Sequence, residues 1–144
     1  MDRPSLPAKL ILALAILGGV SFLVANRFAL PETAMIAWKG SGVALLAVYA
    51  GMRAKALDGW LLAAVMALGA TGDVLLETHG LITGAVAFLA GHLVAITLYL
   101  RNRRPALPRS QLLLAILIIP ATVVIAWLLP ADRAGAPGIA LYST

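Results

Sequence analysis

Four ionisable side chains lie inside long apolar stretches of this sequence, where charged groups are rare. They are Lys39, Asp73, Glu77 and His92. A charge at the centre of a lipid bilayer costs roughly 2.5–3.5 kcal/mol on insertion scales, so such groups usually face a bundle interior or a wet cavity. An amine, two carboxylates and an imidazole can move protons and stabilise developing charge, which is the chemistry of general acid–base catalysis.

The composition indicates that these four residues belong to a membrane protein. The chain has 144 residues, of which 62% are hydrophobic and only 12% are charged, and its mean hydropathy is +0.98. Soluble domains have about 25% charged residues, and disordered chains are still more polar. The absence of cysteine excludes a disulfide scaffold, a thiol nucleophile and Cys-ligated zinc. The sequence therefore predicts an all-α, polytopic membrane protein.

Five apolar blocks predict a transmembrane helix bundle that forms a single domain over residues 1–144. A spanning helix needs about 20 mostly apolar residues, and the Pro- and Gly-rich separators belong at helix ends because lipid does not tolerate unpaired backbone groups. A signal peptide is the alternative for the first block, but residues 23–25 form a poor cleavage site, so we interpret it as a retained helix. The predicted spans are about 10–25, 33–52, 59–77, 81–100 and 111–129.

The last residues, 138–144, begin another apolar stretch. We therefore expect the start of a sixth helix there, and a chain that is the front portion of a longer protein.

The basic residues predict the orientation of the chain in the membrane. The chain has 11 Lys and Arg, and eight of them lie in the N-terminal segment and in alternate loops on one side, whereas the opposite loops hold only Arg27 and Arg133. The positive-inside rule places the N-terminus in the cytoplasm, which for a bacterial protein means the cytoplasmic (inner) membrane. Because topology accounts for the net charge of +5, a nucleic-acid partner loses its support. Membrane lipids are the expected partners, and the oligomeric state stays open.

The four ionisable residues are predicted to converge near the outer side of the membrane. At the rise of an α-helix, Lys39 lies about 9 Å deep, Asp73 about 7 Å and His92 about 16 Å. Glu77 lies one turn from Asp73 on the same helix face. The short turn at residues 78–80 makes the third and fourth helices antiparallel neighbours. An amine and two carboxylates are thus expected in one layer, with an imidazole below them.

Two interpretations of this cluster remain open from the residues alone. In the functional one, Asp73 donates or accepts a proton, as intramembrane carboxylates often do. In the structural one, Lys39 pairs with Asp73 or Glu77 to fix helix register, Glu77 is simply solvated, and His92 bonds to a carbonyl or hydroxyl. A small proton-coupled transporter and a structural membrane protein are the alternative functions. The two histidines lack metal-ligand spacing, so no metal or cofactor is expected.

Three motifs in order give a resemblance to a known family. They are Trp38-Lys39-Gly40, Gly72-Asp73-Val74-Leu75-Leu76, and a Gly84-to-Phe88-to-His92 spacing. Together they resemble the YhhN family, whose characterised members are lysoplasmalogenases with an eight-helix fold. In that family a Lys-Pro pair stands on the second helix, so Gly40 departs from the pattern. Leu141-Tyr142-Ser143 resembles the start of the family's sixth helix, and a second family aspartate would lie beyond Thr144.

The resemblance implies a hydrolase that cleaves the vinyl ether bond of a lysoplasmalogen to a fatty aldehyde and a glycerophospho-head group. Vinyl ethers are cleaved by protonation at carbon, followed by capture of an oxocarbenium ion by water, so a general acid and a stabilising carboxylate are needed, as in glycoside hydrolysis. The implied catalytic residues are Asp73 as acid or stabilising carboxylate, Lys39 to orient Asp73 or bind the phosphate, and His92 to hold water or polarise a partner. Lys39 and Glu77 are the implied substrate-binding residues for the lysolipid, and no cofactor or metal is required.

Overall fold

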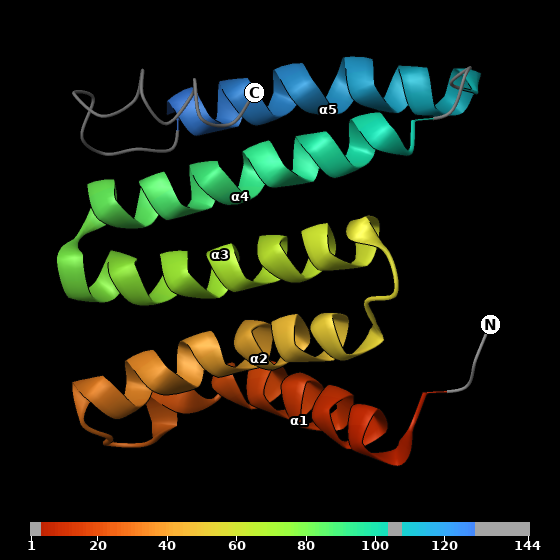
Figure 1. Cartoon of the computed structure of the whole chain (residues 1–144). Coiled ribbons are helices and arrows are strands. Elements are labelled where there is room, and N and C mark those ends of the chain that lie inside the picture. The colour runs from red at the N-terminus through yellow and green to blue at the C-terminus, as the bar shows by residue number, and fades with distance from the viewer. Residues whose placement is uncertain (1–3, 104–107, 129–144) are drawn as a thin grey trace. The chain divides into compact units, whose positions relative to one another are not determined.

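A computed structural model of the protein describes residues 4–103 and 108–128, and these residues form helices and connecting turns without a strand. The predicted all-α class is therefore confirmed. The expected start of a sixth helix lies outside the described residues. The elements, in chain order, are α1 (Leu6–Phe22), a short 3-10 helix η1 (Ala25–Arg27), α2 (Glu32–Arg53), α3 (Leu57–His79), α4 (Leu81–Arg101) and α5 (Arg109–Leu128) (Figure 1).

Four of the helices, α2 to α5, are long and apolar enough to cross a membrane. The first helix is shorter: α1 has 17 residues and ends at Phe22, whereas the sequence predicted a span to residue 25. At 1.5 Å per residue α1 is about 25 Å long, less than the hydrocarbon thickness of about 30 Å. The chain leaves the helix there because i+3 backbone bonds, from Val24 N–H to Ser21 and from Arg27 N–H to Val24, tighten it into η1.

The chain divides into two compact units, residues 1–102 with α1 to α4 and residues 103–144 with α5. Helix α5 continues through Pro120 without interruption. In the first unit, extensive packing joins each helix to its neighbour in the chain, α1 to α2, α2 to α3, and α3 to α4 (Figure 1). The unit is thus a row of successive antiparallel helices.

The predicted antiparallel pairing of the third and fourth helices is confirmed. Only Gly80 separates α3 from α4, and its φ of +87° lies in the left-handed region that glycine adopts without strain. At the far end of this hairpin, Arg101 Nε donates to Asp58 Oδ1 at 2.8 Å, and Asn102 Nδ2 donates to Asp58 Oδ2 at 3.0 Å. The two helices of the hairpin are therefore connected at both ends, by the Gly80 turn and by the hydrogen bonds to Asp58.

Small residues form the contacts between these helices. A Cβ placed on Gly84 would lie 2.7 Å from Cβ of Leu76, and one on Gly42 would lie 2.9 Å from the backbone nitrogen of Gly19. The buried residues of α1 to α4 are all alanine or glycine. In lipid the hydrophobic effect does not drive helices together, so close backbone approach at small residues supplies the packing instead.

Candidate functional site

An ion pair joins α2 to α3 at the residues singled out from the sequence. Lys39 Nζ donates to Glu77 Oε1 at 2.5 Å, and the two side chains are 31% and 40% exposed. The sequence left two carboxylates open as partners of Lys39, and the structure pairs it with Glu77. The alternative in which Glu77 is only solvated is wrong, because its carboxylate accepts this bond.

A cavity of about 200 Å³ lies beside the ion pair. Four residues of α2 line it at spacings of three and four residues, which places them on one helix face. Phe22 at the end of α1 and Glu77 near the end of α3 complete the wall. The residues from α2 are Glu32, Met35, Ile36 and Lys39.

Sequence reasoning missed three kinds of residue in this wall: Glu32, Phe22 and the apolar pair Met35 and Ile36. A signal for the α2 residues was present, because the positions from Glu32 to Lys39 follow the helical repeat that ends at the lysine. No comparable signal marks Phe22, since its place in the wall depends on how α1 packs against α2.

Asp73 lies half-buried on α3, one turn before Glu77. The residues directly before and after Asp73 pack against two different helices, α4 and α2. Gly72 accommodates the ring of Phe88 from α4, whose nearest atom would lie 2.8 Å from a Cβ at that glycine. Val74 packs against Gly40 of α2, where a Cβ would lie 3.3 Å from its Cγ2. Asp73 is therefore held in position by packing on both sides, although Lys39 pairs with Glu77.

The packing around Gly40 explains why a glycine fits at this position, where the family has a proline after the lysine. It is buried, and its missing side chain lets Val74 lie close to α2 directly beside Lys39. A glycine at this position thus keeps Lys39 at the α2–α3 contact.

Along the helix axes, His92 lies further from the Gly80 turn than the other three residues do. It is exposed on α4, one turn beyond Phe88, and the adjacent Gly91 packs beside Leu68 of α3. Leu68 precedes Asp73 by five residues, which corresponds to about 7 Å along the helix. The structure therefore brings Lys39 and Glu77 into contact, places Asp73 one turn away, and leaves His92 outside the cavity wall.

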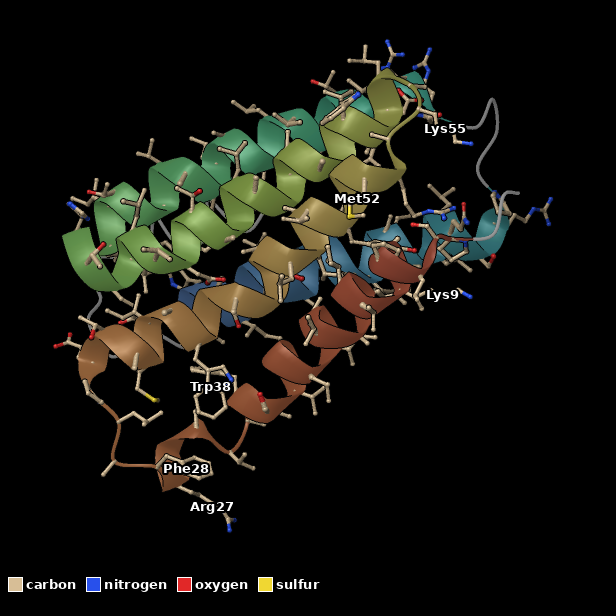
Figure 2. The ribbon with its side chains drawn as sticks, turned by 60° about the horizontal axis from the view of Figure 1, so that its bottom comes forward. Lys9, Arg27, Phe28, Trp38, Met52 and Lys55 are labelled. Atoms are coloured by element: carbon tan, nitrogen blue, oxygen red, sulfur yellow. The ribbon has the colours of Figure 1, made fainter. Side chains whose placement is uncertain are left out.

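An aromatic cluster fixes α1 against the start of α2 next to the cavity. Trp38 Nε1 donates to Ser21 Oγ at 2.9 Å. Its ring lies edge-on to Phe22, with centroids 6.4 Å apart, and 6.0 Å from the ring of Phe28. Figure 2 shows Trp38 and Phe28 together at this end, with Arg27 directed away from them. The cluster holds Phe22 in the cavity wall.

Within residues 4–103 and 108–128, no group of three or more His, Asp or Glu side chains is arranged to hold a metal ion. The described site consists of the Lys39 amine, the carboxylates of Glu32 and Glu77, and an apolar wall.

The fold and this polar site define an all-helical, multi-pass membrane protein. A sequence model of the YhhN family matches residues 34–144, which include Lys39, Asp73, Glu77 and His92. The chain therefore belongs to the YhhN family, and the resemblance found in its motifs is confirmed. No curated protein and no solved structure matches the chain significantly. Phe22 and Glu32 precede the matched segment.

Proposed function

We propose that this protein is a lysoplasmalogenase-like hydrolase that cleaves the vinyl ether bond of a lysoplasmalogen. Membership of the YhhN family supports this activity. The observation that carries the proposal is the Lys39–Glu77 ion pair in the wall of a cavity, with a second carboxylate, Asp73, one helical turn away.

In the proposed reaction a carboxylic acid protonates the β-carbon of the vinyl ether. This creates an oxocarbenium ion, and attack by water at the carbon bonded to oxygen, with loss of its proton, gives a hemiacetal. The hemiacetal then breaks to a fatty aldehyde and the free glycerol hydroxyl. A proton donor and a carboxylate that stabilises the cation are the groups this sequence requires.

We assign Asp73 to the role of acid or stabilising carboxylate, because it is held rigidly between the Gly72–Phe88 and Gly40–Val74 contacts. Lys39 would bind the phosphate of the lysolipid, and Glu77 would orient Lys39 through their ion pair. His92, which lies further from the Gly80 turn along the helix axes, would hold the water. This division of roles requires no cofactor or metal.

The size of the cavity suits one end of a lysolipid. Pockets for drug-sized ligands have volumes of about 300–1,000 Å³. At about 200 Å³ this cavity is smaller, so it matches a polar head group, and the hydrocarbon chain would lie along apolar helix faces. Leu81, Ile82 and Val86 are among the large exposed apolar side chains of α4 that face the surroundings.

The test is aldehyde release from an alkenyl lysolipid by the protein in liposomes. We expect Asp73→Asn to reduce turnover by about 100-fold or more, because a positioned acid contributes about 10²–10⁴-fold. Asp58→Asn is the matched control, since it makes the same change on the same helix at the opposite end. Its bonds to Arg101 and Asn102 are exposed and contribute little to stability, so turnover should stay near that of the unchanged protein. Equal turnover in all three proteins would show that Asp73 has no catalytic role.

The ion pair between two helices also fits a purely structural membrane protein, in which Lys39 and Glu77 serve only to fix α2 against α3. In that case the unchanged, folded protein would release no aldehyde, and removing both charges together would leave the fold intact.

A further inference from the structure

The cavity wall contains one more carboxylate than it contains cations. Its charged residues are Glu32, Lys39 and Glu77. Lys39 and Glu77 neutralise each other at 2.5 Å. For Glu32 the structure records no cation among residues 4–103 and 108–128. The wall therefore has a formal charge of −1, which favours a ligand that places a cation beside Glu32.

The remaining wall residues suit a cation that carries alkyl groups. Phe22 presents an aromatic ring, and cations bind favourably over aromatic faces. Met35 and Ile36 add a soft sulfur and an aliphatic surface between Glu32 and Lys39. A strongly hydrated inorganic cation gains little from such surroundings, whereas an alkylammonium group can contact both the carboxylate and the apolar wall.

The spacing of the charges along α2 matches a zwitterion. Glu32 and Lys39 are seven residues apart, so they lie on the same helix face and are separated by about 10 Å along the axis. Both have long side chains that can reach toward each other across the cavity. The Lys39 ammonium has three N–H donors and gives one to Glu77, so it can also donate to a phosphate, while Glu32 attracts the ammonium group.

We infer that Glu32 binds the ammonium group of a zwitterionic lysolipid head group and thereby sets head-group preference. The inference rests on the proposed function for the identity of the ligand as a lysolipid. Glu32 lies before the segment that the family model matches, so this role is argued from the cavity and not from family membership.

The experiment measures binding, so it does not require turnover. Saturated lysolipids of equal chain length, with phosphocholine or phosphoglycerol head groups, are titrated onto the full chain in a maltoside detergent. The unchanged protein should bind the phosphocholine lipid more tightly. Glu32→Gln should weaken phosphocholine binding about two- to fivefold, the usual effect of one exposed charge contact, and should not weaken phosphoglycerol binding. Glu32→Asp should keep the preference.

A charge-matched control separates a local contact from a general effect of helix charge. In the double variant Glu32→Thr with Thr33→Glu, the carboxylate stays in the first turn of α2, where it still interacts with the helix dipole, but moves about 100° around the helix. Thr33 is not part of the cavity wall. We expect this variant to bind like Glu32→Gln, and binding like that of the unchanged protein would overturn the inference.

Further outcomes distinguish the ligand source and the proposed function. Soluble glycerophosphocholine should bind more than about tenfold more weakly than the lysolipid, because it lacks the buried chain, and equal binding would overturn the assignment to a lipid. Equal weakening of both lysolipids by Glu32→Gln would also overturn it. If the preference depends on Glu32 but no vinyl ether is cleaved, the inference stands and the proposed hydrolase activity fails.

Discussion

Of its two candidate partners on α3, Lys39 pairs with the one nearer the end of the helix, and the chemistry of lysine explains this pairing. A lysine in a membrane extends its aliphatic stem along apolar surface and places its amine toward the interface. Glu77 lies one turn nearer the end of α3 than Asp73, so the extended amine meets Glu77. Beside Lys39, the Gly40–Val74 contact brings α2 against α3. Asp73 therefore takes no part in the ion pair of Lys39.

The ion pair gives a prediction about stability. Glu77→Gln leaves the amine of Lys39 without its carboxylate and should lower the free energy of unfolding by about 1 kcal/mol, since the pair is partly exposed. The double variant Lys39→Met with Glu77→Met should lose less than the single variant, because no charge is left unpaired. Unfolding in mixed micelles measures both. With Lys39→Met and Glu77→Met also measured singly, a loss in the double variant equal to the sum of those two losses would show that the pair contributes nothing.

At the scale of elements, the α3–α4 hairpin positions the site. Gly80 makes the turn. About one helical turn away from it Gly84 lies against Leu76, and about one turn further Gly72 lies against Phe88. These contacts set a single register between the two helices. Because Asp73 follows Gly72 directly, its position depends on this register.

A substitution at the closest of these contacts tests the dependence. Gly84→Ala would place its Cβ 2.7 Å from Cβ and 2.8 Å from Cα of Leu76, so the helices must separate. We expect a loss of about 1–3 kcal/mol in the free energy of unfolding, the usual range for overpacking, together with reduced aldehyde release. Gly19→Ala is the matched control, because nothing lies within 4 Å of a Cβ there. Similar losses in both variants would contradict this account of the register.

At the scale of the first unit, the charged loops lie at opposite ends of the helices. Lys9, Met52 and Lys55 lie toward one end, and Arg27 and Phe28 lie at the opposite end, beside the aromatic cluster that adjoins the cavity (Figure 2). This separation is the arrangement that the positive-inside rule uses. The cytoplasmic placement of the N-terminus remains a prediction, and it would put the cavity near the outer surface.

The absence of cysteine makes that orientation easy to measure. Single variants Arg27→Cys and Lys55→Cys can be labelled in intact cells with a membrane-impermeant maleimide. We expect labelling at position 27 from outside, and labelling at position 55 only after permeabilisation. The reverse pattern would invert the predicted topology and place the cavity on the cytoplasmic side.

The sequence by itself determined the all-α class of the protein, the approximate bounds of α2 to α5 and the pairing of α3 with α4. These properties follow from local quantities. Transfer of apolar side chains into lipid fixes which segments are helical, and a turn of one glycine permits only an antiparallel hairpin. The predicted spans of α2 to α5 accordingly agree with the observed helices to within two residues at each end.

The tertiary structure alone decided that Lys39 pairs with Glu77, which is 38 residues away, and that Glu32 and Phe22 share a cavity with them. It also decided that α1 ends at Phe22. These properties depend on the rotation of each helix about its axis and on its register against the next. Both are set by how closely backbones approach at Gly40, Gly72 and Gly84, and a hydropathy pattern contains no information about that approach.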